Sequence, residues 1–146
     1  MILYNKKVLL HTLMETTNYN LNIFFSTQLE NLECDDDTRA YIVGVLDRFK
    51  TASTDYSKDS LTLLYADAKF RQDFYTFQNI GDWLFFCNTL FPEHLNKASQ
   101  DYYYAIGQLS YYACYRLINR QWKLYEKMAD QFIYLSHSTR SIIHKY

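Results

Sequence analysis

The acidic residue Asp82 stands out because it precedes a strongly apolar run, Trp83 to Phe86. A carboxylate in this place can cap a new helix by accepting hydrogen bonds from its first backbone N–H groups. Alternatively, the carboxylate is buried, and it then needs a partner because an unpaired buried charge is costly. The segment that follows offers phenol and guanidinium partners, and these are candidate binding residues together with Asp82: Tyr103, Tyr104, Tyr111 and Arg116.

Tyrosine is concentrated in the segment 101–115, where six of fifteen residues are tyrosine. A tyrosine side chain has an apolar ring and one polar tip, so it can pack in a core while its hydroxyl reaches a polar partner. The favoured interpretation is a core helix with hydrogen-bonded phenols. A subunit interface and a ligand pocket are the alternatives, since tyrosine is also enriched at interface centres.

Motifs for metal, phosphate or nucleophilic chemistry are not found. The four histidines form no i,i+4 pair and no HExxH motif, and three glycines cannot build a phosphate-binding loop. The acidic run 33–37 is interpreted as the start of a helix. Each cysteine, at positions 34, 87 and 114, lacks a local catalytic signature. We therefore expect no metal site and no cofactor, and the assignment as an enzyme is uncertain, with a non-enzyme favoured.

Composition favours helices. The 146 residues include 49% hydrophobic and 18% aromatic residues, but only 3 Gly and 1 Pro. Sheet proteins need many tight turns, which depend on glycine and proline. The sequence therefore predicts an all-α fold, a single compact bundle of five to seven helices that forms one domain over residues 1–146.

The same totals limit partners and location. The net charge is −1 without a basic cluster, which argues against a nucleic-acid partner. No apolar run approaches the roughly 18 residues of a membrane span, and no leader is recognised at the start of the sequence. Three widely spaced cysteines are typical of reduced thiols, so a cytoplasmic location is expected.

Apolar spacing predicts helices over about 18–32, 36–49, 60–77, 82–91, 101–119 and 120–143. Over residues 1–15 the pattern is ambiguous: a helix is favoured, and an extended start is the alternative. The helix over 60–77 carries two apolar stripes on nearly opposite sides, so it should lie between neighbours. Gly81 is expected to break or bend the chain. The Tyr-rich helix should bury the stripe formed by Tyr102, Ile106, Leu109, Ala113 and Leu117.

Three segments also resemble an uncharacterised family of bacterial all-helical proteins: YIVGVLDRF (41–49), GDWLFFCNTLFPE (81–93) and YYYAIGQLSYY (102–112). The matching positions are Gly81, Asp82, Phe86, Phe91, Pro92, Glu93, Tyr102, Tyr103, Gly107 and Tyr111. Thr89 and Ser110 depart from its pattern. The resemblance implies an all-helical bacterial protein without a known activity. It also implies that Asp82, Glu93 and Tyr103 form one constellation.

Two functions follow as hypotheses. The favoured one is a non-enzymatic cytosolic helical domain that binds a protein partner or itself, most simply as a homodimer. The alternative is a small-molecule-binding protein or enzyme whose Tyr-lined pocket surrounds Asp82, between segments 81–91 and 102–119. Nucleic-acid binding through aromatic stacking would need a basic groove beside the rings.

Overall fold

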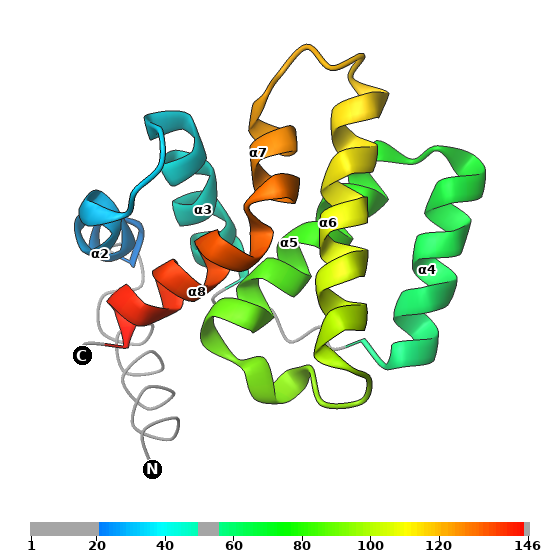
Figure 1. Ribbon diagram of the computed structural model, residues 1–146, viewed down its shortest axis with the longest axis horizontal. Helices are drawn as coiled ribbons and strands as arrows, with labels where there is room; N and C mark the ends of the chain where they lie inside the picture. The colour runs from blue at the N-terminus through cyan, green and yellow to red at the C-terminus, as the bar shows by residue number, and fades with distance from the viewer. Residues whose placement is uncertain (1–20, 50–55, 145–146) are drawn as a thin grey trace. The chain divides into compact units, whose positions relative to one another are not determined.

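The computed structural model describes residues 21–49 and 56–144, and within these ranges the chain is all-α (Figure 1). The predicted all-α class is confirmed, and no strand occurs in the described residues. The expected helix over 1–15 lies outside them. The described residues form seven α-helices and two short 3₁₀ helices, in this order: α2 (Leu21–Gln28), η2 (Leu29–Asn31), α3 (Asp36–Phe49), α4 (Lys58–Arg71), α5 (Phe74–Leu90), η3 (Pro92–His94), α6 (Gln100–Leu117), α7 (Leu124–Asp130) and α8 (Phe132–Ile143).

The described residues divide into two compact units, one made of residues 21–49 and 138–144 and the other of residues 56–137. Helices α2, η2 and α3 belong to the first unit, whereas α4, α5, η3, α6, α7 and the start of α8 belong to the second. All the candidate site residues lie in the second unit. The expectation of a single domain over the whole chain stays a prediction.

In the first unit, Arg39 of α3 holds the turn that follows α2. Its guanidinium donates to the carbonyl oxygens of Leu29, Leu32 and Cys34 at 3.1, 2.7 and 3.0 Å. The α3 helix is capped by Asp35, whose Oδ1 accepts from the Thr38 N–H at 2.8 Å. A charged side chain therefore supplies the partners that these turn carbonyls need.

Helix starts in the second unit use short polar side chains as caps. Ser57 caps α4 by accepting from the Ser60 N–H at 3.1 Å, and Asp73 caps α5 by accepting from the Thr76 N–H at 3.3 Å. Such caps satisfy N–H groups that have no partner within the helix. At the other end of α4, Gln72 takes a left-handed conformation with φ of 52° and ends the helix.

Helix α5 is the most deeply buried element. Every residue from Ile80 to Leu90 is buried, so neighbours surround this half of the helix. Of the break or bend predicted at Gly81, the break is wrong, since α5 runs without interruption through this position. Among the described helices, none combines the length and the hydropathy needed to cross a membrane.

Helix α6 packs along α5 but buries a different face from the one predicted. Its buried residues are Tyr103, Tyr104, Gly107, Ser110, Tyr111, Ala113, Cys114 and Tyr115. Leu109 of the predicted stripe is 44% exposed. Tyrosine takes inner positions because its hydroxyls find partners there, as those of Tyr104 and Tyr111 do.

The last predicted helix, 120–143, is divided into α7 and α8 at Gln131. Phe132 begins α8 and packs edge-on against Phe85 of α5, with ring centroids 5.7 Å apart. Next to this contact, the amide of Asn88 donates to the Ser136 hydroxyl at 2.6 Å in a buried site. Helices α5, α6 and α8 thus share one aromatic core with polar contacts inside it.

Candidate functional site

Asp82 lies inside α5 and does not cap a helix. Its carboxylate is 1% exposed, and Oδ1 accepts a hydrogen bond of 2.6 Å from the Tyr111 hydroxyl of α6. Of the two interpretations open from the sequence, the helix cap is therefore wrong and the buried, paired carboxylate is confirmed. Tyr111 was among the four predicted partners.

Gly81 makes the pairing possible because it lets the two helices come close together. A Cβ atom at this position would lie 2.9 Å from Cε1 of Tyr111 and 3.1 Å from two other ring atoms. The ring therefore lies directly against the α5 backbone, and its hydroxyl reaches the next residue, Asp82. Around it, the rings of Tyr125 and Phe132 lie 6.3 and 6.1 Å from that of Tyr111.

Cys114 lies one helical turn after Tyr111 and shares this buried environment. Burial raises the pKa of its thiol, and the nearby negative charge of Asp82 raises it further. The sulfur lies 3.8 Å from the Phe74 carbonyl oxygen, to which the thiol donates. A thiol held in its protonated form is a poor nucleophile, so this environment suits a structural cysteine.

Asp82 is too enclosed for ligands to reach it in this conformation. Its phenol partner is completely buried, and the carboxylate shows almost no surface to solvent. The pair therefore acts as a polar contact between α5 and α6. This differs from the expected Tyr-lined pocket with Asp82 on its wall.

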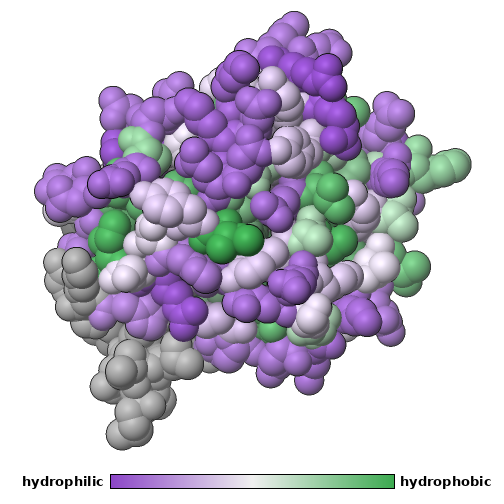
Figure 2. All heavy atoms as spheres, viewed as in Figure 1, coloured by the Kyte–Doolittle hydropathy of each residue, from purple (hydrophilic) through white to green (hydrophobic). Residues whose placement is uncertain are grey.

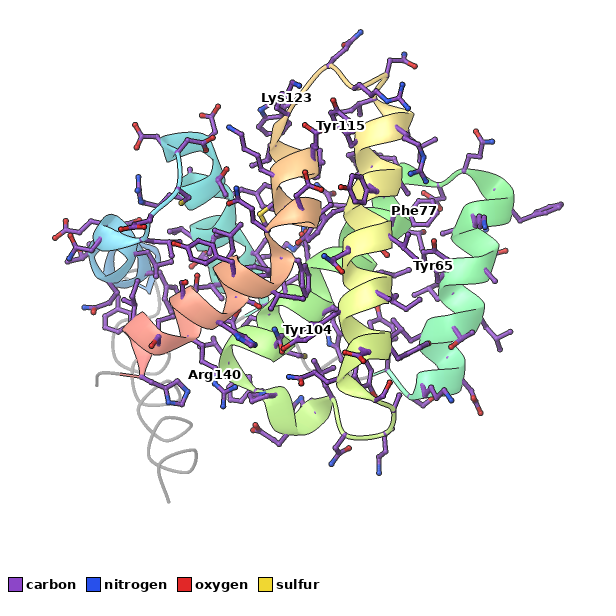
Figure 3. All side chains as sticks on the ribbon, in the orientation of Figure 1. Tyr65, Phe77, Tyr104, Tyr115, Lys123 and Arg140 are labelled. Atoms are coloured by element: carbon purple, nitrogen blue, oxygen red, sulfur yellow. The ribbon has the colours of Figure 1, made fainter. Side chains whose placement is uncertain are left out.

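Tyr104 forms a second and separate polar contact. Its hydroxyl accepts from Nε2 of Gln100 at 2.7 Å and lies 2.7 Å from Nε2 of His137 on α8. The Tyr104 ring, labelled in Figure 3, is buried. Its centroid lies 6.4 Å from that of Phe132. The phenol thus joins α6 to α8, away from the Asp82 pair.

Arg116 lies on the exposed side of α6 and is not paired with Asp82. It approaches Tyr65 of α4, whose ring packs edge-on against Phe77 with centroids 5.5 Å apart (Figure 3). Burial raises the pKa of Tyr65, and the positive charge of Arg116 partly opposes this effect. Arg116 therefore belongs to the boundary between α4 and α6.

Glu93 and Tyr103 lie near a surface pocket and not beside Asp82. Asp82 is eight residues from the end of α5, which is about 12 Å along a helix axis, and Glu93 lies beyond that end in η3. The Tyr103 hydroxyl accepts from the Lys97 backbone N–H at 3.2 Å. The expected constellation of Asp82, Glu93 and Tyr103 is therefore divided between the core and the pocket.

The pocket has a volume of about 660 Å³ and lies between the start of α4 and the segment around η3. Charged residues of both signs line it: Lys58, Asp59, Glu93 and Lys97, with His94 beside them. Sequence reasoning singled out only Glu93. The two lining segments are more than thirty residues apart, and no local motif indicates that they meet.

The outward face of α4 is the second feature that the sequence only partly indicated. Tyr65 and Ala68 of one predicted stripe face inward. The other stripe is divided, because Leu63 and Phe70 are 71% and 89% exposed on α4 whereas Phe77 is buried in α5. Figure 2 shows hydrophobic side chains reaching outward over α4. The single helix predicted over 60–77 is wrong, because the chain ends α4 at Gln72 and begins α5 after Asp73. The expected packing on two sides fails for the α4 part, since no element of the described residues covers the face with Leu63 and Phe70.

Comparisons with family models, with curated proteins and with solved structures found no match. The resemblance to a bacterial helical family therefore stays a prediction. Across residues 21–49 and 56–144, no group of three or more histidine, cysteine or acidic side chains comes together in a way that could hold a metal ion.

Proposed function

We propose that this chain is a non-enzymatic, cytoplasmic helical protein that acts through self-association, and that a second copy docks on the outward face of α4. The observation that carries the proposal is the exposure of Phe70 and Leu63. These residues are seven positions apart, so they lie on the same face of the helix, two turns from each other. Large apolar side chains grouped on one face are typical of protein interaction sites.

The chemistry of α4 fits a second copy of itself in antiparallel orientation. Ala66, small and exposed, lies midway between Leu63 and Phe70 and would let two helices approach closely. Around this midpoint, Leu63 of each copy would meet Phe70 of the other. Acidic Asp59 lies in the first turn, whereas Lys69 and Arg71 lie in the last. Antiparallel pairing would bring these opposite charges to the same ends of the interface, which favours this orientation.

A cytoplasmic location is part of the proposal. All three cysteines of the chain are outside disulfides, which is usual in a reducing compartment. The tyrosine-rich helix α6 fits the same function. Its phenols make hydrogen bonds inside the unit, so the outward face of α4 remains available for binding.

The proposal is tested by measuring mass in solution with sedimentation velocity over a wide range of concentration. The wild type should dimerise, and Phe70→Gln and Leu63→Gln should each weaken the dimer at least tenfold. Leu109→Gln is the matched control, because it removes a 44% exposed leucine from α6 and not from α4. A wild type that stays monomeric at high concentration, or a control as damaging as Phe70→Gln, would contradict the proposal.

A further inference from the structure

The pocket at the start of α4 has the size of a small-molecule site. Its volume of about 660 Å³ lies within the roughly 300–1,000 Å³ that such sites occupy. Two segments form its walls: residues 56–59, which lead into α4, and residues 93–97, which follow α5. Both segments belong to the same compact unit.

Glu93 provides the most specific sign of a ligand. Unlike Asp82, its side chain is only half-buried and lines the pocket, and its Oε2 atom has no hydrogen-bond partner among the described residues. Burying a polar atom without a partner is costly, and more so for a carboxylate oxygen. Glu93 therefore requires a donor that the described part of the chain does not supply.

Lysine side chains line the same pocket without neutralising Glu93. Within the described residues, neither Lys58 nor Lys97 forms an ion pair with Glu93 or Asp59. The Lys58 ammonium lies 5.8 Å from the centre of the Tyr102 ring, and the backbone of Lys97 is held by the Tyr103 hydroxyl. The pocket thus presents an acceptor and two cationic donors that are not satisfied by one another.

Aromatic contacts hold both walls of this charged pocket in place. Tyr56 packs edge-on against Trp83 of α5, with ring centroids 4.9 Å apart. His94 stacks on Phe91 at 5.7 Å, with an angle of 21° between the rings. Trp83 lies in α5, and Phe91 just beyond its end packs on Phe86 of α5 with ring centroids 5.7 Å apart, so both walls are supported by the core.

We propose that this pocket binds a small zwitterion of the free amino acid class. Glu93 accepts from the ammonium group of the ligand, and Lys58 and Lys97 bind its carboxylate. Tyr103 is a positioning residue, since it holds the backbone that carries Lys97. A simple anion would be repelled by Glu93 and Asp59, and a simple cation by the two lysines, so a ligand with both charges fits best.

Isothermal titration calorimetry on the full chain tests the proposal with each of the standard L-amino acids. Acetate and methylammonium serve as probes that carry one charge only. We expect at least one amino acid to bind, and both single-charge probes to bind at least tenfold more weakly. No binding by any amino acid, or equal binding by a single-charge probe, would overturn the proposal.

Variants separate the two ends of the ligand. Glu93→Gln and Lys97→Met should each weaken amino acid binding at least tenfold. Asp101→Asn and Lys123→Met are the controls, because they remove exposed charges outside the pocket. Both should leave the affinity for the amino acid unchanged. Lys97 is exposed, so its variant keeps the test valid even if Glu93→Gln disturbs folding. If Lys97→Met bound the amino acid with wild-type affinity, the proposed contact between Lys97 and the ligand carboxylate would be wrong. Binding that persists in monomeric Phe70→Gln distinguishes this site from the self-association of α4.

Discussion

The ring of Tyr111 lies against the backbone of α5 at Gly81, so close that an added Cβ would be 2.9 Å from the ring. The glycine leaves space for the ring, and the following residue, Asp82, accepts the hydrogen bond of the phenol at 2.6 Å. One buried contact thus combines a steric requirement with a polar one. It fixes the distance between α5 and α6 in the unit that holds all the candidate site residues.

Gly81→Ala should destabilise the protein. Alanine favours a helix over glycine by about 1 kcal/mol, but forcing extra volume into a packed core costs about 1–3 kcal/mol. We expect a net loss of up to about 2 kcal/mol in the free energy of unfolding, measured by urea denaturation. Gly44→Ala is the control, because the added Cβ meets no atom within 4 Å and should stabilise α3 by about 0.5–1 kcal/mol. Equal effects of the two substitutions would contradict the close contact.

Tyr111→Phe should also destabilise the protein, because it removes a donor from a buried carboxylate while keeping the ring. The expected cost is about 1–3 kcal/mol in the free energy of unfolding. Tyr134→Phe, at an exposed position, should change it by less than about 0.5 kcal/mol. If the two variants were equally stable, the hydrogen bond between Asp82 and Tyr111 would make no net contribution to the free energy of unfolding.

The thiols should differ sharply in reactivity. Cys114 is buried and its pKa is raised, and Cys87 is buried as well, whereas Cys34 is half-buried. A thiol reagent at pH 8 should therefore modify Cys34 first and the other two only after unfolding. Cys34→Ser should abolish the rapid reaction. Rapid labelling of Cys114 in the native protein would contradict its enclosure beside Asp82.

The cap of α5 should depend on pH. Hydrogen bonds from the hydroxyl and N–H of Thr76 hold the pKa of Asp73 below its ordinary value of 3.8. The pKa of Asp73 is lower in the folded state than in the unfolded state. The charged cap therefore stabilises the protein fully at a pH above the ordinary value of 3.8, and this stabilisation is lost as the pH falls through the folded pKa. Asp73→Asn keeps a capping side chain but removes the charge. The stability difference between wild type and variant should therefore shrink below about pH 4. A difference that stays constant down to pH 2 would argue against this account.

Much of the helical architecture could be predicted from the sequence, because few glycines and prolines leave little choice but long helices. The tyrosines of α6 were correctly expected to bury their rings with hydrogen-bonded hydroxyls, as Tyr104 and Tyr111 do. The prediction of the buried face of α6 is wrong, because a ring with a polar tip can occupy inner or outer positions equally well on a helical wheel.

The errors have two physical causes. Gly81 is predicted to mark a break or a bend, although a glycine within a helix can also mark close packing against a ring. The apolar residues Ile80 and Trp83 near it were the available signal. The pocket was missed for a different reason. Its walls come from segments that only tertiary packing brings together, and Glu93 alone does not reveal Lys58 as a neighbour.

The complete enclosure of α5 between Ile80 and Leu90 has a kinetic consequence. Backbone amides in this stretch can exchange with heavy water only when the surrounding helices separate, so their exchange should report the largest opening of the unit. The exposed α4 helix should exchange through smaller, local fluctuations. Its amides would then slow on dimer formation, while those at the centre of α5 keep their rate.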